Sequence, residues 1–219
     1  MPTPGRNSAA TDTATRALEI AQRLAQTRGF NGFSYADIAD ELAITKASLH
    51  YHFESKADLG LALIEGYTEG FKDALDALTG NAVTLLRGYA QLYESVLVRD
   101  RMCLCGMLAA EYSTLPRSMQ NALRRFFDMN DEWLTRTLDR GRAAGVLGFD
   151  GTALEAARVL TAGFEGAMLL ARSYSEPARF SATAKRLLAH LNAAAAAPGS
   201  RAKPRRASPR PARRGAAHR

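Results

Sequence analysis

Residues 33–59 read FSYADIADELAITKASLHYHFESKADL, and this stretch decides the fold. Three residues in it, Ser34, Thr45 and Ser55, stand where helix N-caps are expected. Ser34 and Ser55 are each followed three residues later by an aspartate, which is the spacing of a capping box. Only residues 43–45 separate the first short helix from the second, so the two helices must cross steeply. The stretch therefore predicts a helix-turn-helix.

The second short helix, residues 46–52, keeps a polar face after its apolar positions are assigned to the core. Ammonium, hydroxyl and imidazole groups on such a face can donate to phosphates and base edges, and an alanine methyl can contact a thymine methyl. We predict that this helix reads double-stranded DNA in the major groove. The alternative is a helical hairpin whose polar residues simply face water.

From about Thr13 to Tyr67 the sequence resembles the DNA-binding domain of the TetR/AcrR family of bacterial transcriptional regulators. The most specific part is ITKASLHYHFESK at residues 44–56. Ala47 stands where the family usually has glycine, and His50 stands where it usually has tyrosine, which leaves the base preference open. The resemblance implies DNA contacts from Ser34, Thr45, Lys46, Ala47, Ser48, His50, Tyr51, His52 and Lys56.

Composition places the chain among globular proteins. Apolar residues make up 47% of the 219, which is ample for a packed core, and no apolar run approaches the roughly 20 residues of a membrane span. The first 16 residues lack the apolar core of a secretory signal. Two cysteines fit a reducing compartment. We therefore expect a cytoplasmic protein.

The net charge of +7 comes from the last residues of the chain. Residues 199–219 hold eight cations and no acid, and subtracting these eight from +7 leaves −1 for residues 1–198. With four prolines after residue 197 and no aliphatic side chain larger than alanine, we expect residues 198–219 to form a disordered basic tail. Two interpretations stay open: the tail holds DNA phosphates through counterion release, or it is a dispensable solubilising extension.

Helical periodicity dominates the whole chain, so we predict an all-α protein of about nine helices. After the helix-turn-helix, long helices are expected at residues 56–78, 83–98, 116–145 and 152–174, the last capped by Asp150. The predicted organisation is a disordered arm at 1–12, a three-helix DNA-binding domain at 13–58, an effector-binding and dimerisation domain at 59–197, and the tail at 198–219.

The helix expected at residues 152–174 is apolar on more than one side and carries small residues that allow close approach. Such a helix suggests a protein partner. The TetR resemblance implies that the last two helices pair with those of a second copy in a homodimer. A single short reading helix contacts too few bases to be selective, and two-fold symmetry doubles the site. The alternative is that both helices are internal.

Aromatic and methionine residues between residues 83 and 145 are candidates for an effector pocket that would take an apolar or aromatic small molecule. Glu111 and Asp131 could anchor a cationic group. The alternative is that these residues are ordinary core. No cofactor is predicted. The residues chosen as effector-binding are Tyr93, Cys103, Met107, Phe127 and Trp133.

Residues 102–111 read MCLCGMLAAE and contain both cysteines. Cys103 and Cys105 point to different sides of a helix, so they form a poor metal site, and no metal is predicted. The pattern resembles TetR-family members that respond to electrophiles or oxidants, which implies a sensing thiol at Cys103. Arg99 and Arg101 lie close in sequence and would favour the thiolate. The alternative is a small buried side chain.

Together these observations favour a non-enzymatic, effector-released repressor that binds a palindromic operator as a homodimer. By the family resemblance, effector binding would move the helix at residues 56–78. One alternative is thiol-based electrophile sensing through Cys103. Another is a thiol enzyme, although the nearest histidines in sequence, His50 and His52, lie in the reading helix. A third is a non-specific architectural nucleic-acid-binding protein that depends on the tail.

Overall fold

The computed structural model describes residues 5–196, with side chains from residue 12 to residue 191. Within this range all the regular secondary structure is helical, as predicted. The basic tail expected at residues 198–219 lies outside the described residues. The helices are α1 Gly5–Arg28, α2 Tyr35–Leu42, α3 Lys46–His52, α4 Lys56–Asp76, α5 Ala82–Leu97, α6 Leu104–Ala110, α7 Arg117–Ala143, α8 Ala153–Ser173 and α9 Ala178–Ala196, with a short 3-10 helix at Tyr112–Thr114.

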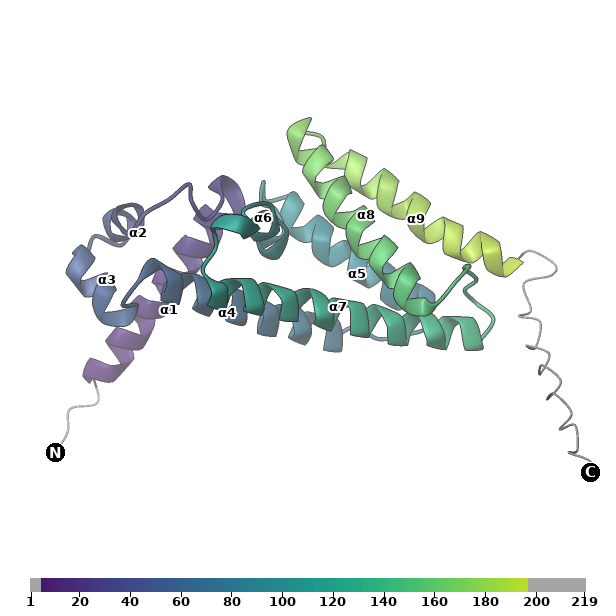
Figure 1. The fold of residues 1–219 in the computed structure, drawn as a ribbon, viewed down its shortest axis with the longest axis horizontal. Helices are drawn as coiled ribbons and strands as arrows, with labels where there is room; N and C mark the ends of the chain where they lie inside the picture. Colours follow the sequence, from purple (N-terminus) through teal and green to yellow (C-terminus); the bar gives the residue numbers. More distant parts are fainter. Residues whose placement is uncertain (1–4, 197–219) are drawn as a thin grey trace, which may run out of the picture.

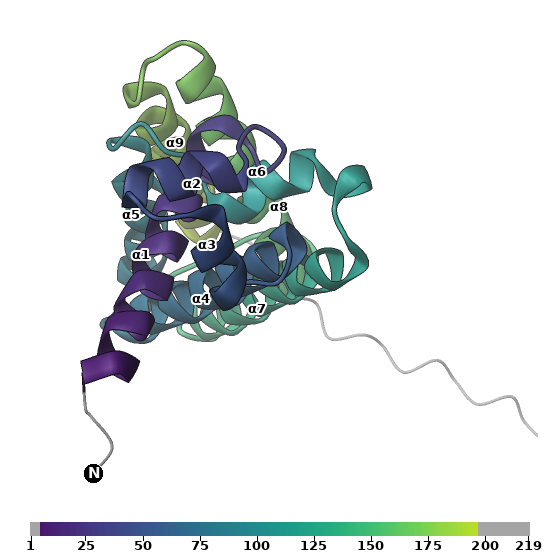
Figure 2. The same cartoon turned by 90° about the vertical axis from the view of Figure 1, so that its left-hand side faces the viewer.

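The helices form an elongated molecule with α1, α2 and α3 at one end (Figure 1). Helices α4 and α7 contact each other and run side by side along the length. Helices α8 and α9 pack together above α5, and α7 also contacts α8. Figure 2 views the end formed by the first three helices, with α3 facing the reader.

The caps predicted from the sequence hold the helix-turn-helix. The backbone N–H and the hydroxyl of Ser34 both donate to the Asp37 carboxylate, at 2.8 and 2.7 Å. These hydrogen bonds lower the pKa of Asp37. The hydroxyl oxygen of Thr45 accepts from the backbone N–H of Ser48 at 3.1 Å. Helix α2 ends at Leu42, and the next residue, Ala43, has a left-handed φ of 54° that turns the chain sharply into α3.

Two boundaries differ from the sequence prediction. Helix α1 begins at Gly5, so residues 5–12, which the sequence assigned to a disordered arm, are helical. No proline follows Pro4 in this stretch, so nothing interrupts the backbone hydrogen bonding. Helix α8 is capped by Thr152 and not by Asp150: the Thr152 hydroxyl accepts from the backbone N–H of Glu155 at 3.1 Å.

An aromatic cluster fills the centre of the helices that follow α4. The ring of Tyr89 lies 5.3 Å from that of Tyr93 and 5.7 Å from that of Trp133. Phe71 of α4 meets this cluster edge-on, 6.0 Å from Tyr89. Because the cluster joins α4, α5 and α7, a shift of one of these helices must repack the others. Across residues 5–196, we find no helix whose length and hydropathy would let it cross a bilayer.

Helix α4 belongs to both halves of the molecule. It contacts α1 on one side and α7 on the other. At Gly60 the approach is so close that a methyl group would overlap Met119 of α7 and Phe30 beside α1. The domain boundary predicted between residues 58 and 59 therefore falls in a helix that both halves share, and it stays a prediction.

Candidate nucleic-acid interface and interior cluster

Helix α3 turns one residue inward and presents a polar face to solvent. Leu49 is 0% exposed and anchors the helix in the core, whereas Tyr51 is 83% exposed. Lys46, Ala47 and Tyr51 share the solvent-facing side. In the described part of the chain, the side chains of Lys46 and Tyr51 take part in no hydrogen bond or ion pair. These groups are free to donate to phosphates or base edges.

The remaining predicted contacts on α3 are partly fixed by their neighbours. Nδ1 of His50 lies 3.0 Å from the carbonyl oxygen of Glu54, and its ring lies 4.7 Å from that of Tyr35. The His52 ring packs edge-on against Tyr51 at 5.3 Å. Ser48 is half-buried and gives its backbone N–H to the helix cap. The rings of His50 and His52 are therefore held by neighbouring residues, and Tyr51 is the most exposed large side chain of the helix.

Two of the predicted DNA contacts have other partners in the structure. The hydroxyl of Ser34 is used by its capping box. The ammonium of Lys56 faces inward, donates to the carbonyl oxygens of Phe30 and Phe33, and lies 4.5 and 4.4 Å from the centres of their rings. Burial lowers the pKa of Lys56. The phosphate contact of Lys56 stays a prediction, and in this structure its side chain holds the loop between α1 and α2.

Comparison with known proteins agrees with this geometry. Residues 17–63, which span the helix-turn-helix, match the sequence model described as "Bacterial regulatory proteins, tetR family". Transcriptional regulator AcuR of Cereibacter sphaeroides is 31% identical over 160 residues, which cover 68% of this chain and 72% of AcuR. The chain belongs to the TetR family.

Other TetR-family proteins extend the likeness over the C-terminal helices. The transcriptional repressor NemR of Escherichia coli K12 is 28% identical over 168 residues, which cover 74% of this chain and 84% of NemR. A crystal structure of a TetR-family regulator from Agrobacterium tumefaciens matches with a TM-score of 0.81 and 33% identity, over 84% of this chain and 99% of that one. The protein is a DNA-binding transcriptional regulator, and its relatives are regulators and not enzymes.

In this TetR-family regulator, the C-terminal end of α1 is held by residues from the other half of the chain. The side-chain amide of Gln26 donates to the carbonyl oxygen of Met102 at 2.8 Å. In return, the backbone N–H of Met102 donates to the carbonyl oxygen of Gln26 at 3.2 Å. The guanidinium of Arg172 on α8 donates to the carbonyl oxygens of Gln26 and Thr27, both at 2.9 Å. These carbonyls belong to the last turn of α1, where helix acceptors lack intrahelical partners.

The loop after α1 is held in a similar way. The carboxylate of Glu111 accepts from the backbone N–H groups of Phe30, at 2.7 Å, and Asn31, at 3.3 Å. This corrects the suggestion that Glu111 anchors a cationic effector, because its oxygens bind the DNA-binding half. Asp131, the other suggested anchor, forms an ion pair with Arg158 at 3.1 Å.

The predicted effector residues lie in or beside the aromatic cluster. Tyr93 and Trp133 are both buried, and the rings of both lie against Tyr89. Cys103 is buried at the start of α6, and Met107 is half-buried on the same helix. Phe127 is half-buried on α7. Tyr93 and Cys103 are brought together through a carboxyl group that the sequence reasoning did not select.

That group is Glu165 of α8. The side chains of Tyr93 and Cys103 lie close enough to lower its pKa, and its Oε1 atom is inaccessible to solvent and has no hydrogen-bond partner. Burial raises the pKa of Glu165 to about 7. A signal for it existed in the sequence, because Glu165 is the one charged residue in the otherwise apolar run TAGFEGAMLLA at residues 161–171.

The structure does not support the predicted activation of the Cys103 thiol. Both cysteines are buried, and burial followed by the nearby Glu165 carboxylate raises the pKa values of Cys103 and Cys105. The expected help from Arg99 and Arg101 is wrong, because neither arginine contributes to the pKa of Cys103. The thiolate is disfavoured at this position.

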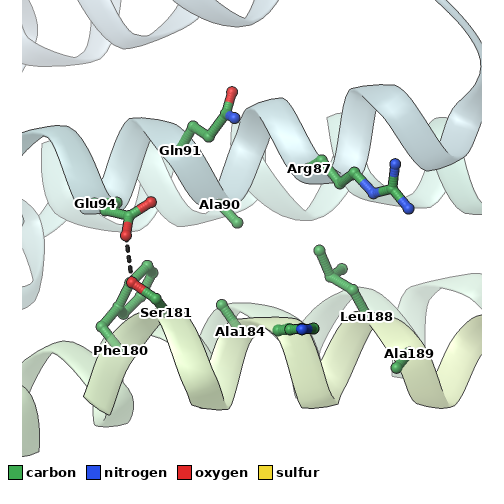
Figure 3. A pocket seen from close by; sticks show the side chains of 10 residues that line it. Arg87, Ala90, Gln91, Glu94, Phe180, Ser181, Ala184, Leu188 and Ala189 are labelled. Carbon is green, nitrogen blue, oxygen red and sulfur yellow. Dashed lines mark hydrogen bonds between the residues drawn. The ribbon is translucent and has the colours of Figure 1, made fainter. Parts of the chain in front are cut away.

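Two apolar grooves flank α9. One lies between α5 and α9, has a volume of about 450 Å³, and is floored by Ala90, Phe180 and Ala184 (Figure 3). A hydrogen bond from the hydroxyl of Ser181 to Glu94 crosses one end of it. The other groove, of about 420 Å³, lies between α8 and α9 beside Val159. Helix α9 is thus incompletely packed on both sides.

Proposed function

We propose that this TetR-family regulator is an effector-released repressor that binds a palindromic operator as a homodimer. The observation that carries the proposal is the single short reading helix of each chain, with Tyr51 83% exposed beside Lys46. One such helix covers only a few base pairs, so selective repression requires a second copy one helical turn further along the duplex.

The surface of α8 supports the homodimer. Val159, Leu169 and Leu170 are 62%, 55% and 58% exposed and lie on the side of α8 that faces away from the core. Large apolar side chains in one exposed row favour a protein interface. Because the groove between α8 and α9 adjoins Val159, the same side could receive the corresponding helices of a second copy.

A response to effectors requires a physical link between the interior and the reading helix. Two such links are available. Helix α4 carries Phe71 into the aromatic cluster and begins directly after α3. Arg172 connects α8, the helix of Glu165, to the last turn of α1. An effector that binds one arrangement of these helices better than the other would shift the separation of the two reading helices.

Selection of bound sequences from a random DNA pool tests the operator part of the proposal. The expected product is an inverted repeat with half-sites about one helical turn, roughly 10 base pairs, or a multiple of it apart. Light scattering on the purified complex should give the mass of two chains or a multiple of two. Recovery of unrelated sequences, with binding governed by salt alone, would instead support the architectural alternative.

Replacement of Arg172 tests the link through α1. Arg172→Met should retain operator binding and weaken its release by effector, because the contact between α8 and α1 is lost. Arg158→Met is the matched control, since Arg158 lies on the same helix and pairs only with Asp131 among the described residues. Equal release in the two variants would remove Arg172 from the coupling route.

Thiol-based sensing predicts a different result. If modification of Cys103 releases DNA, an added electrophile should free the operator from the wild-type protein and not from Cys103→Ser. Burial of the thiol and its raised pKa lead us to expect slow modification and equal responses. A fast response confined to the wild-type protein would make the thiol the sensor.

A further inference from the structure

The groove between α5 and α9 exists because small side chains face each other across it. Ala90 of α5 and Ala184 of α9 point toward one another, and their methyl groups are too short to fill the space between the two helices (Figure 3). Both alanines are buried, so the groove reaches down to the core. Phe180 closes its base with a ring that stacks on Tyr93 at 6.3 Å. The floor of the groove is therefore apolar and is held in place by the packed interior.

The size of the groove suits a small molecule with an aliphatic chain. Its volume of about 450 Å³ lies within the range of roughly 300–1,000 Å³ that is usual for ligand pockets. It follows α5 from Arg87 to Glu94, and this part of the helix rises about 10 Å. A straight alkyl chain of roughly eight carbons, with C–C bonds of about 1.5 Å, has a similar length. Release of water from the apolar floor favours burial of such a chain.

The two ends of the groove differ in charge. At one end the hydroxyl of Ser181 donates to the carboxylate of Glu94, so this acid already has a partner (Figure 3). Arg87 stands at the opposite end, and Lys185 lines the groove from α9. Within the described part of the chain, neither cation belongs to an ion pair or to a side-chain hydrogen bond. Two unpaired cations beside an apolar floor are complementary to an anionic head group on an apolar chain.

This groove lies away from the surface proposed for the homodimer. The groove beside Val159 is lined from α9 by Arg186 and His190, whereas the groove between α5 and α9 is lined by Ser181 and Lys185. Successive residues of a helix turn by about 100°, which places these two pairs on nearly opposite sides of α9. A second copy that packs on the side of Val159 would therefore leave the groove between α5 and α9 open to solvent.

We propose that the groove between α5 and α9 binds a medium-chain aliphatic carboxylate. The alkyl chain lies between Ala90 and Ala184. The carboxylate pairs with Arg87 and Lys185. The proposal goes beyond the proposed function, because this site lies outside the aromatic cluster and its occupation requires neither DNA nor a second copy. A bound chain would fill the space that leaves α9 incompletely packed against α5, and binding to the folded protein alone would stabilise it.

Probes of one length separate the effect of charge from that of apolar burial. Octanoate, 1-octanol and octylammonium are titrated by calorimetry into the full-length protein, below the concentrations at which they form micelles. Octanoate should bind about fivefold more tightly than octanol, which is the upper range for partly exposed charge pairs. Butanoate should bind at least about tenfold more weakly than octanoate, because four methylene groups are missing. Absence of octanoate binding, equal affinity for octanol or butanoate, or a preference for octylammonium would each overturn the proposal.

A substitution that fills the groove tests whether the ligand binds there. Ala184→Leu places a larger side chain between α5 and α9 and should lower the affinity for octanoate at least about tenfold, because the space for the chain is lost. Ala182→Leu is the matched control, since Ala182 is an exposed alanine on the same helix that does not line the groove. Equal octanoate binding by the two variants would place the ligand elsewhere, for example in the aromatic interior, and would refute the proposed site.

A second set of variants leaves the packing unchanged, so it serves even if Ala184→Leu does not fold. Lys185→Gln combined with Arg87→Gln should lower the affinity for octanoate to that for octanol. Lys72→Gln, which removes an exposed cation from α4, should leave the affinity unchanged. If the double variant still prefers octanoate to octanol, the two cations are not its partners and the proposal is wrong. Operator binding measured on the same preparations is a separate result: a protein that binds octanoate but selects no palindrome loses only the proposed function.

Discussion

Helices α3 and α8 each bury one face and leave the other uncovered, and the four faces have different chemistry. The buried face of α3 depends on Leu49, whereas that of α8 is bordered by the half-buried side chain of Glu165. The uncovered face of α3 carries Lys46 and Tyr51, and that of α8 carries a row of aliphatic side chains that includes Leu170. A polar uncovered face fits a nucleic acid, and an aliphatic one fits a second protein chain.

Loss of the α3 anchor should have the largest effect on stability. Leu49→Ala removes a fully buried side chain and should lower the free energy of unfolding by about 2–5 kcal/mol. Chemical denaturation followed by circular dichroism measures this change. A loss of unfolding free energy below about 1 kcal/mol would mean that the buried face of α3 does not anchor the helix. The difference drawn between the buried faces of α3 and α8 would then not hold.

The carboxyl group of Glu165 on α8 should make the free energy of unfolding depend on pH. Burial raises the pKa of Glu165 from 4.5 to about 7, so the folded protein binds a proton that the unfolded chain has lost. The stability from this group is complete below pH 4.5 and should decline by about 3 kcal/mol as the pH rises through 7. The difference in unfolding free energy between wild type and Glu165→Gln isolates it, since other groups cancel. A difference that does not change with pH would place the carboxylate in water.

A charged substitution on the exposed face of α8 tests whether that face binds a second chain. Leu170→Glu should weaken the proposed homodimer by about 2 kcal/mol or more, because each copy would bury a carboxylate in the proposed interface. Val98→Glu is the matched control, since Val98 is 65% exposed but lies after α5. Sedimentation at several concentrations measures the association. Equal weakening in both variants would show that α8 is not the interface.

The uncovered face of α3 should matter to DNA and not to folding. Tyr51→Ala should change the unfolding free energy by less than about 0.5 kcal/mol, because the ring is mostly in solvent. It should cost about 1–3 kcal/mol in binding to the selected operator if the hydroxyl or ring reaches base edges. Fluorescence anisotropy with operator and scrambled duplexes separates the cases. An equal loss on both duplexes would assign Tyr51 to the backbone.

The two helices also differ in how much of them the sequence predicts. The order around α3 rests on contacts three or four residues apart, such as those between Ser34 and Asp37, and a local pattern contains all of their information. The partners of α8 lie far away in sequence. Arg172 binds a carbonyl 146 residues earlier, and Glu165 meets Tyr93 and Cys103 on two other elements. No periodicity predicts such pairs. The fold class was therefore predictable from the sequence, and the surroundings of Arg172 and Glu165 were not.

Lys56 and Glu111 illustrate the same limit from the other side. Each is a charged residue at a position where function was expected, and each is used to hold the backbone of residues 30–33. Charge and position in sequence do not indicate which way a side chain turns. Only the surrounding carbonyl and N–H groups decide that, and they become visible when the whole chain is folded.

The fork of Arg172 on the last turn of α1 offers a readout that needs no operator. While the guanidinium holds the carbonyl oxygens of Gln26 and Thr27, that turn and the reciprocal bond from the Met102 amide are protected together. If an effector draws α8 away, the turn should fray and its amide protons should exchange with deuterated solvent sooner. Mass spectrometry of the peptides around residues 24–31 and 102 would then follow the contact between α8 and α1 directly, in the protein without DNA.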